Sequence, residues 1–247
     1  MDQIEVRAEL TAQERAATLK LFNRMCHTHL LVDKKMTAYL EERKISRSTI
    51  DRFMLGSLPS VDRLRAQLGS NGFRMSLVGH DENGKLISKF SDNPLIIPIF
   101  DQYGSEVAVI GRAVCSDEEM DARDISKYNN TSFKKGDILF GLNLAIDSIR
   151  DKDKVYIVEG NFDVITAHQS GFRNVVATSG TMFTMQQLVI LSRYTKNIVL
   201  LFDNDASGQE AADTHINNYK NYGVNIRKGN VPTEFKDLDE YLKSKAI

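Results

Sequence analysis

The chain has 247 residues, of which 42% are apolar and 26% are charged, and its formal net charge is −1. This composition predicts a sizeable core and excludes a strongly basic protein, so any binding of nucleic acid has to come from local patches. Cys26 and Cys115 are far apart in the sequence and lack metal-ligand spacing, so neither a disulfide framework nor a zinc site is indicated. No signal peptide and no apolar run of membrane-spanning length is recognisable, so we expect a cytoplasmic protein with no membrane partner.

The first third of the chain is predicted to be helical. Thr11 and Glu14 form a capping-box pattern, and apolar residues follow at three- and four-residue spacing as far as Leu30. Further helices are expected at 34–43, after Ser46, and from Ser60 to a stop at Gly69. Residues 20–74 hold eleven lysines and arginines against five acids, which is compatible both with a solvated helical face and with a surface for nucleic acid.

The middle of the chain has the pattern of a small antiparallel sheet. Strand-like runs surround Asn83-Gly84 and again Tyr103-Gly104, and both pairs are typical of hairpin turns. The polar stretch 115–136 is predicted to be a long loop, and helical periodicity returns over 138–149.

From Val155 to the C-terminus, short apolar strands alternate with helices. Such alternation predicts an α/β domain with a parallel sheet and helices on both of its faces. Right-handed crossovers then bring the carboxyl ends of the strands to one edge, where folds of this kind bind ligands. We therefore expect a helical and mixed α+β subdomain over 1–150 and a parallel-sheet domain over 151–247.

Acidic residues follow three of the predicted strands or begin the helix after them. They are Glu159 and Asp163, Asp203 and Asp205, and Asp237 and Asp239. Taken one at a time, Asp237 is explained as a helix cap and Asp163 as an acid favoured by the helix dipole. Six carboxylates at one sheet edge instead favour a hard cation, Mg²⁺ or Mn²⁺, acting at a phosphate group.

Several stretches of the sequence, including those that carry the acidic residues, resemble a known family. "VEGNFDVI", "ATSGT" and "LLFDNDASGQEAA" are similar to the TOPRIM domain of topoisomerases and of bacterial and phage DnaG-type primases. Upstream, "YLEERKI", "PLIIPIFDQYGSEVAVIGRAV" and "KYNNTSFKKGDILFGL" resemble, in order, the motifs of the primase catalytic core, and "KDLDEYL" resembles its last acidic pair.

The resemblance implies a DNA primase that makes short RNA primers from nucleoside triphosphates on a single-stranded DNA template during replication. Two metal ions, Mg²⁺ or Mn²⁺, would activate the primer 3′-hydroxyl and stabilise the leaving pyrophosphate. Glu159, Asp203 and Asp205 are the expected catalytic ligands, with Asp163, Asp237 and Asp239 in support; Glu159 is left open as a ligand or a general acid or base. The residues expected to bind nucleotide or template are Arg43, Arg112, Lys127, Tyr128, Asn130 and Lys135.

The chain also departs from the family pattern. Asn204 stands where a glycine is usual between the two aspartates, Asn161 where an aromatic is usual, and "KFSDNPLIIPI" lacks the arginines expected before its strand. The zinc-binding and helicase-binding domains have no counterpart. We therefore expect either a core that works by itself, from a phage or mobile element, or a piece of a longer protein, with a zinc-domain protein and a replicative helicase as partners in trans.

Several alternatives use the same acidic residues. A TOPRIM nuclease or RNA maturase would cleave phosphodiesters with the same metals, and a non-catalytic accessory would bind DNA without turnover. "DNDAS" also resembles the loop of haloacid-dehalogenase-type phosphatases, but that loop normally follows the first strand of its domain and here it follows the third. A topoisomerase is disfavoured because 247 residues leave no room for strand-gate domains.

Overall fold

The structure is a computed structural model that describes residues 9–180 and 182–245. Thr181, the last residue of the "ATSGT" stretch, lies outside these residues. The chain forms two compact units: unit 1 comprises 9–42, 50–99 and 106–133, and unit 2 comprises 43–49, 100–105 and 134–245. The boundary after residue 150 stays a prediction. No helix within 9–180 or 182–245 combines the length and the apolar character needed to cross a membrane.

Unit 1 begins with the predicted helices. They are α1 (Ala12–Leu30), α2 (Lys34–Glu42), α3 (Arg47–Phe53), which starts in unit 2, and α4 (Val61–Arg74). The capping box of α1 is confirmed, because the Glu14 N–H donates to the Thr11 hydroxyl at 3.2 Å and the Thr11 N–H donates to the Glu14 carboxylate at 2.9 Å. The helix stop expected at Gly69 is confirmed as an interruption, because the backbone leaves the helical conformation at this residue. Gly69 takes a φ of +54° that glycine tolerates, and the chain kinks there before the helix resumes and packs Gly72 against Leu68.

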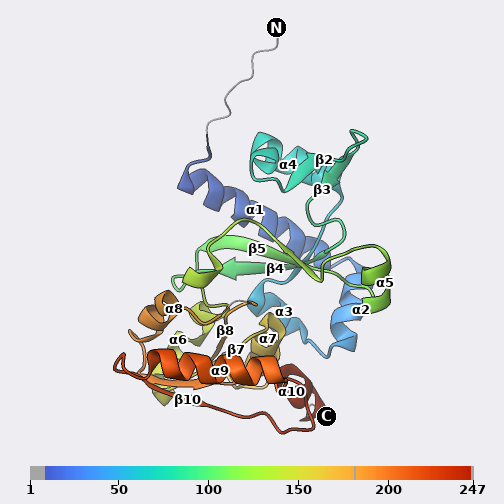
Figure 1. Ribbon diagram of the computed structural model, residues 1–247. Coiled ribbons are helices and arrows are strands. Elements are labelled where there is room, and N and C mark those ends of the chain that lie inside the picture. Colours follow the sequence, from blue (N-terminus) through green and yellow to red (C-terminus); the bar gives the residue numbers. More distant parts are fainter. Residues whose placement is uncertain (1–8, 181, 246–247) are drawn as a thin grey trace. The chain divides into compact units, whose positions relative to one another are not determined.

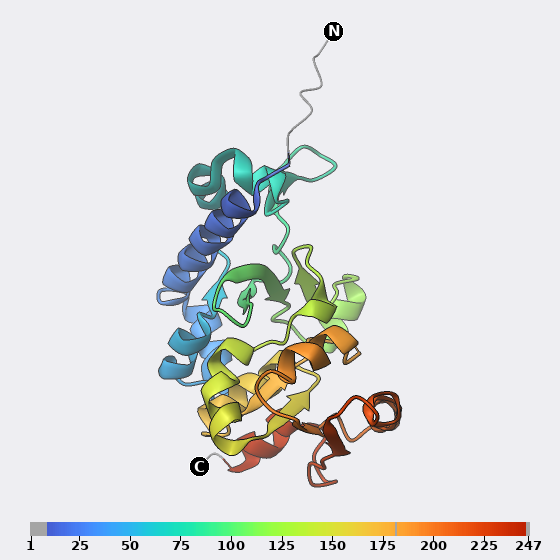
Figure 2. The same ribbon diagram turned by 90° about the vertical axis from the view of Figure 1, so that its left-hand side faces the viewer.

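The antiparallel strands of unit 1 form two sheets. The larger has the order β1 (Gly56–Ser57), β4 (Leu95–Phe100), β5 (Glu106–Arg112), β6 (Tyr128–Asn130), and the smaller pairs β2 (Val78–His80) with β3 (Leu86–Ser88). Both predicted hairpins are present, and Gly84 and Gly104 take the positive φ that their turns require. Helix α4 lies beside the β2–β3 hairpin in both views (Figures 1 and 2).

The stretch predicted as a long loop carries regular structure, so that prediction was wrong. It contains α5 (Asp117–Ala122), the edge strand β6 and a short 3₁₀ helix, η1 (Lys135–Asp137). Helix α5 begins where the Ser116 hydroxyl accepts a hydrogen bond from the Glu119 N–H, and β6 is polar because it pairs at the sheet edge with β5. Periodicity missed both because the helix is short and the strand is only partly covered.

Unit 2 is built on a parallel sheet, as predicted. Its strands lie in the order β10 (Asn225–Lys228), β9 (Asn197–Leu200), β7 (Val155–Val158), β8 (Val175–Ala177), and every neighbouring pair is parallel. The helices are α6 (Leu142–Lys152), α7 (Asn161–Gln169), α8 (Met185–Leu191), α9 (Ala206–Tyr219) and α10 (Leu238–Lys245). Helix α6 starts later than predicted, because Phe140 pairs with Ala177 at the edge of the sheet and Gly141 takes a left-handed conformation before the first turn.

Helices cover both faces of this sheet. On one face, residues of α6, α8 and α9 share a core with Ile157, Ile198 and Leu200. On the other face, α7 packs on β8 and α10 packs against α7. Figure 1 shows α9 running along the sheet beside β10. All four strands point the same way, so their carboxyl ends share one edge.

Gly56 provides a test of the packing inside unit 1. A Cβ atom at Gly56 would lie 2.6 Å from Cys26 Cβ and 2.7 Å from the Cys26 carbonyl carbon on α1, which cannot move away independently. We expect Gly56→Ala to lower the free energy of unfolding by about 2 kcal/mol. Gly79→Ala, which meets no atom within 4 Å, should change it by less than about 0.5 kcal/mol. Equal urea midpoints for the two variants would contradict this packing.

Candidate functional site

Glu159 and Asp203 lie together at the carboxyl edge of the unit 2 sheet. Glu159 directly follows β7, Asp203 is the third residue after the end of β9, and the Asp203 N–H donates to Glu159 Oε1 at 3.1 Å. Gly208 passes close to both residues: a Cβ there would lie 2.6 Å from the Asp203 carbonyl oxygen and 2.9 Å from Glu159 Oε1. Glycine is therefore required where the first turn of α9 meets the strand ends.

Asp205 and Asp237 each begin a helix beside this pair. Asp205 is exposed and is the N-cap of α9, where its carboxylate accepts a hydrogen bond from the Gly208 N–H at 2.8 Å. Asp237 is half-buried, precedes α10 and accepts from the Glu240 N–H at 2.8 Å. Each carboxylate uses one oxygen for the helix, and this arrangement leaves the second oxygen for another partner.

Asp163 is the most buried of the six acids. It lies in the first turn of α7 with 6% of its surface exposed, and its Oδ1 accepts a hydrogen bond from the Asp239 N–H at 2.9 Å. Burial, followed by the negative charge of Asp237, raises the pKa of Asp163 to about 7. Burial and the carboxylates of Glu159 and Asp237 raise the pKa of Asp203 to about 6, against the opposing effect of Lys236. These acids therefore lie within electrostatic range of one another.

The carboxylates lie close together, but their oxygen atoms do not surround a common position for an ion. Within the part of the chain that the structure describes, no three His, Cys, Asp or Glu side chains form a group that could hold a metal ion as they stand. The donor set nevertheless fits a hard cation, because Glu159, Asp163, Asp203, Asp205 and Asp237 offer only oxygen atoms. Burial and the neighbouring carboxylates raise the pKa values of Asp163 and Asp203, so the ionised forms that would bind a cation are disfavoured in its absence.

Asp239 differs from the other five acids because its charge is matched by side chains. Its Oδ2 accepts from Arg43 Nη2 at 2.8 Å and from Lys243 Nζ at 2.6 Å, and its Oδ1 accepts from the Thr166 hydroxyl at 2.5 Å. The Arg43 guanidinium also lies 4.2 Å from the centre of the Phe162 ring. Two residues that were expected to bind metal and phosphate thus bind each other, joining the segment after α2 to α10 and α7.

Arg112 and Tyr128 are cross-strand partners on β5 and β6 of unit 1. Arg112 Nε donates to the Tyr39 hydroxyl at 3.1 Å, Arg112 Nη1 donates to the Tyr128 hydroxyl, and the guanidinium lies 5.2 Å from the centre of the Tyr128 ring. Tyr39 was not predicted from the sequence, and it holds the guanidinium from α2. The exposed Tyr128 ring and the Arg112 charge form a surface of the kind that stacks a base or binds a phosphate.

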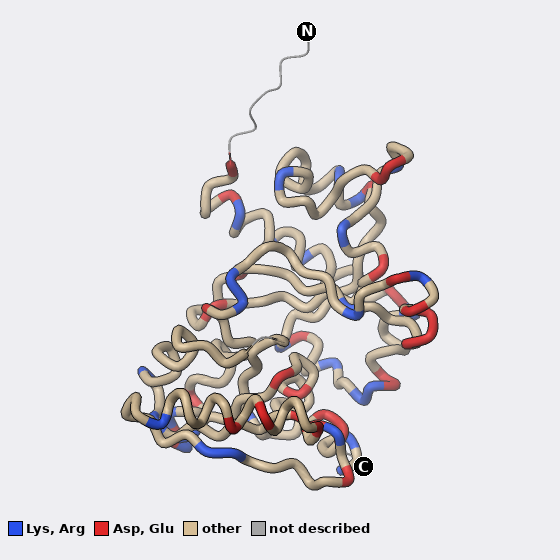
Figure 3. Tube along the Cα trace, viewed as in Figure 1, with Lys and Arg blue, Asp and Glu red and all other residues tan. Residues whose placement is uncertain are grey.

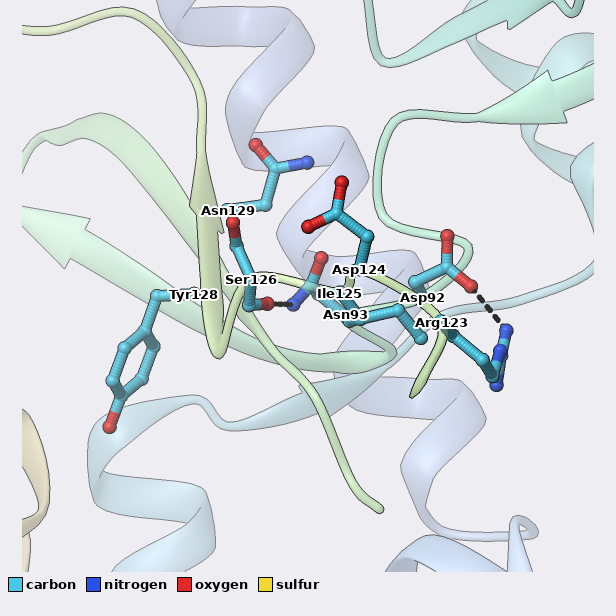
Figure 4. Close-up of a pocket in the computed structure, with 8 residues that line it drawn as sticks. All are labelled: Asp92, Asn93, Arg123, Asp124, Ile125, Ser126, Tyr128 and Asn129. Atoms are coloured by element: carbon cyan, nitrogen blue, oxygen red, sulfur yellow. Dashed lines mark hydrogen bonds and ion pairs between the residues drawn. The ribbon is translucent and has the colours of Figure 1, made fainter. Parts of the chain in front are cut away.

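Tyr128 also lines a polar hollow of about 420 Å³ in unit 1 (Figure 4). In the hollow an Asp92–Arg123 ion pair at 2.8 Å and a hydrogen bond from Asn93 Nδ2 to the Ser126 carbonyl hold the walls, and Tyr128 lies at the opposite end of the view from Arg123. Figure 3 shows the lysines and arginines of unit 1 on several elements with acids between them, so its positive surplus is distributed.

The remaining predicted binding residues divide between the units. Lys127 is exposed beside Tyr128, and Asn130 is half-buried with its side-chain amide bonded to the Thr131 carbonyl at 2.9 Å. Lys135 lies in η1 of unit 2, where its carbonyl accepts from Gln187 Nε2 at 3.3 Å. Binding of nucleotide or template by the side chains of Lys127, Asn130 and Lys135 stays a prediction.

Comparison with known proteins assigns the chain to a family. Residues 25–146 match the family described as DNA primase catalytic core, N-terminal domain, and residues 156–242 match the Toprim-like family. The two regions follow each other in the order that the sequence motifs indicated. The chain belongs to the DnaG-type DNA primase catalytic cores.

Sequence relatives and solved structures support this assignment. The chain is similar to the DNA primase of Synechococcus elongatus, at 34% identity over 83% of this chain and 31% of the relative. Among solved structures, the Aquifex aeolicus primase matches 94% of this chain and 58% of its own, with 28% identity and a TM-score of 0.83. A DnaG primase catalytic domain bound to single-stranded DNA matches 94% of this chain and 77% of its own, with 25% identity and a TM-score of 0.81. The chain spans about a third of the length of the Synechococcus protein.

The acidity of the TOPRIM site has a measurable consequence in the metal-free protein. The pKa values of Asp163 (about 7) and Asp203 (about 6) exceed the ordinary value for an aspartate. At pH values between that ordinary pKa and the raised ones, the folded state therefore binds more protons than the unfolded state. Their contribution to the free energy of unfolding is therefore fully present below about pH 4 and is lost as the pH rises toward about pH 7. Added Mg²⁺ should raise the melting temperature more at about pH 8 than at about pH 5.5, where protons compete for the same oxygens.

Thermal unfolding with EDTA or with MgCl₂ checks this expectation. Asp163→Asn should weaken the pH dependence of the metal-free protein, because the substituted residue no longer titrates. An Mg²⁺ effect that is the same at both pH values would contradict the involvement of these carboxylates.

The role of Asp239 is tested by its stability. We expect Asp239→Asn to lower the free energy of unfolding by about 3 kcal/mol, because Arg43 and Lys243 would lose a buried counter-charge. The control is Asp205→Asn, which keeps a capping residue at α9 and should change stability by less than about 0.5 kcal/mol. Urea unfolding in EDTA measures both. If Asp239→Asn is as stable as the parent, Asp239 is not held in this way and the prediction that it binds metal regains its support.

Proposed function

We propose that this chain synthesises short RNA primers from nucleoside triphosphates on single-stranded DNA, using Mg²⁺ or Mn²⁺, during DNA replication. The observation that carries the proposal is the group of un-neutralised carboxylates at the carboxyl edge of the TOPRIM sheet, in a chain of the primase family. A related catalytic domain has been solved with single-stranded DNA, which supports the template class.

In this proposal Glu159, Asp203 and Asp205 are the principal ligands, and Asp163 and Asp237 support them. When bound, one or two divalent ions would supply electrostatic stabilisation of the attacking 3′-hydroxyl and of the leaving pyrophosphate. The protein's own contribution is to hold these oxygens at one edge: Glu159 accepts the Asp203 N–H, and Gly208 allows the first turn of α9 to approach both. Glu159 serves in this proposal as a ligand or as a general base or acid.

The nucleotide and template are assigned to basic and aromatic residues of both units. Arg112, held by Tyr39 and Tyr128, presents a fixed guanidinium, and Tyr128 offers a ring for stacking. Lys127, Asn130 and Lys135 complete the predicted set. For Arg43 we propose a supporting role through Asp239, because its guanidinium is already bonded to that carboxylate and packs on Phe162.

The partners are proposed from the family. We propose a zinc-domain protein and a replicative helicase as partners in trans, because the family implies them. We also propose a phage origin and action in the host cytoplasm. The chain itself spans about a third of the Synechococcus primase.

Primer synthesis by the purified chain tests the function. The reaction contains single-stranded DNA of mixed sequence, labelled ribonucleotides and Mg²⁺ or Mn²⁺. The variant is Asp203→Asn/Asp205→Asn, which keeps the α9 cap while it removes two negative charges. We expect short RNA products from the parent and a loss of about a thousandfold or more in the variant, since metal stabilisation contributes several kcal/mol.

Asp213→Asn is the matched control. Asp213 lies on the same helix α9, is exposed, and pairs with Lys228 at 2.7 Å, so its loss should leave primer synthesis unchanged. Metal-dependent shortening of the template without RNA products would favour a TOPRIM nuclease. If neither product forms even after a zinc-domain protein is added, the chain is a DNA-binding accessory and the proposal is wrong.

A further inference from the structure

Asn204 occupies the position between the two aspartates that follow β9. It is half-buried, and its side-chain Nδ2 lies 3.2 Å from the Val231 carbonyl oxygen, 3.2 Å from that of Pro232 and 2.7 Å from that of Phe235. Its backbone N–H donates to the Lys236 carbonyl at 2.9 Å. One residue thus bonds to four carbonyl groups of a single loop, 231–236.

The direction of the amide is determined by these partners. Three carbonyl oxygens surround one side-chain atom, so that atom must be the NH₂ group, because an oxygen there would be repelled by all three. The Phe235 carbonyl takes the shortest bond, and the other hydrogen is shared between the Val231 and Pro232 carbonyls. A side chain without donors at this position would remove these three hydrogen bonds, although the Pro232 carbonyl would keep the bond that it accepts from the Phe235 N–H at 3.0 Å.

The loop that Asn204 holds leads directly into the acidic site. Residues 231–236 connect β10 to α10 and end next to Asp237. Asp237 and Lys236 both act electrostatically on Asp203, and Asp237 acts on Asp163, so the loop delivers one negative and one positive side chain to this edge of the sheet. Between Gly229, whose N–H bonds to the Leu200 carbonyl, and the start of α10, Asn204 supplies the main hydrogen bonds from the sheet edge to the loop among the described residues.

We propose that Asn204 is a positioning residue of the metal site, which sets the place of Asp237 and Lys236 relative to Asp203 through its bonds to the 231–236 loop. This inference rests on the proposed function, because it requires that the carboxylates bind a divalent cation. In this proposal Asn204 acts through the loop, because its amide nitrogen donates to the carbonyl groups of 231–236. Residues that orient metal ligands in this way typically change metal affinity by about ten- to a hundredfold when they are replaced.

The test is a direct titration of the intact protein with Mn²⁺, in which unbound Mn²⁺ is measured by electron paramagnetic resonance. We expect Asn204→Ala to raise the dissociation constant by about tenfold or more. Hydrogen exchange should show faster exchange in the loop and in the first turn of α10. Asn204→Ser, which keeps a single shorter donor, should fall between the parent and the alanine variant. It serves as the second variant if alanine impairs folding.

Asn197→Ala is the matched control. Asn197 begins the same strand, β9, at the opposite edge of the sheet, and its Nδ2 donates to the Asp153 carbonyl oxygen at 2.9 Å and to Asp153 Oδ2 at 3.0 Å. The Asn197→Ala substitution should lower stability to a similar extent and leave Mn²⁺ affinity within about twofold of the parent, because Asn197 lies away from the ligands.

Primer synthesis by Asn204→Ala should need more Mn²⁺ for half-maximal rate and recover at saturating Mn²⁺.

Two outcomes overturn the inference while the proposed site stands. These are unchanged Mn²⁺ affinity in Asn204→Ala, and an equal loss of affinity in Asn197→Ala, which would mean that general destabilisation is responsible. A parent protein that binds no Mn²⁺ would instead overturn the metal site of the proposed function, and the inference with it.

Discussion

Burial of neighbouring carboxylates at the edge of a parallel sheet is the constraint on which the TOPRIM unit depends. Parallel strands deliver their carboxyl ends to one edge, and here the loops and helices that follow bring Glu159, Asp163, Asp203 and Asp237 into range of one another. Burial, followed by the neighbouring carboxylates, raises the pKa values of Asp163 and Asp203, so their ionised forms destabilise the fold unless protons or cations neutralise them. A divalent cation satisfies the same need at neutral pH, so the cost in stability and the capacity for phosphate chemistry have one origin.

The protein treats its acids in two different ways. Asp239 is neutralised internally by Arg43 and Lys243 and is bonded to Thr166, so it joins α10 to α7 and to the segment after α2. Glu159, Asp205 and Asp237 instead accept hydrogen bonds from backbone N–H groups, which orient a carboxylate without cancelling its charge. Asn204 belongs to this second arrangement, because it orients the loop that carries Asp237 with a neutral amide.

Two arginines of unit 1, Arg112 and Arg123, are held by different kinds of partner. Arg112 is half-buried, and the hydroxyls of Tyr39 and Tyr128 accept hydrogen bonds from its guanidinium. Arg123, by contrast, is paired with Asp92 and Glu119. The same residue type is therefore oriented by tyrosine hydroxyls at one position and by carboxylates at another.

The sequence by itself determined the features that depend on near neighbours: the capping box of α1, the two hairpin turns, and the alternation that makes the sheet of unit 2 parallel and brings its acids to one edge. It missed α5 and β6, whose signals are short and polar. The tertiary structure alone decided which acid is neutralised, because Arg43 and Asp239 meet across 196 positions of the chain, and which base Tyr39 holds. A charged side chain has the same local pattern whether its counter-charge is a distant residue or a cation, so only folding, which brings distant residues together, separates the two.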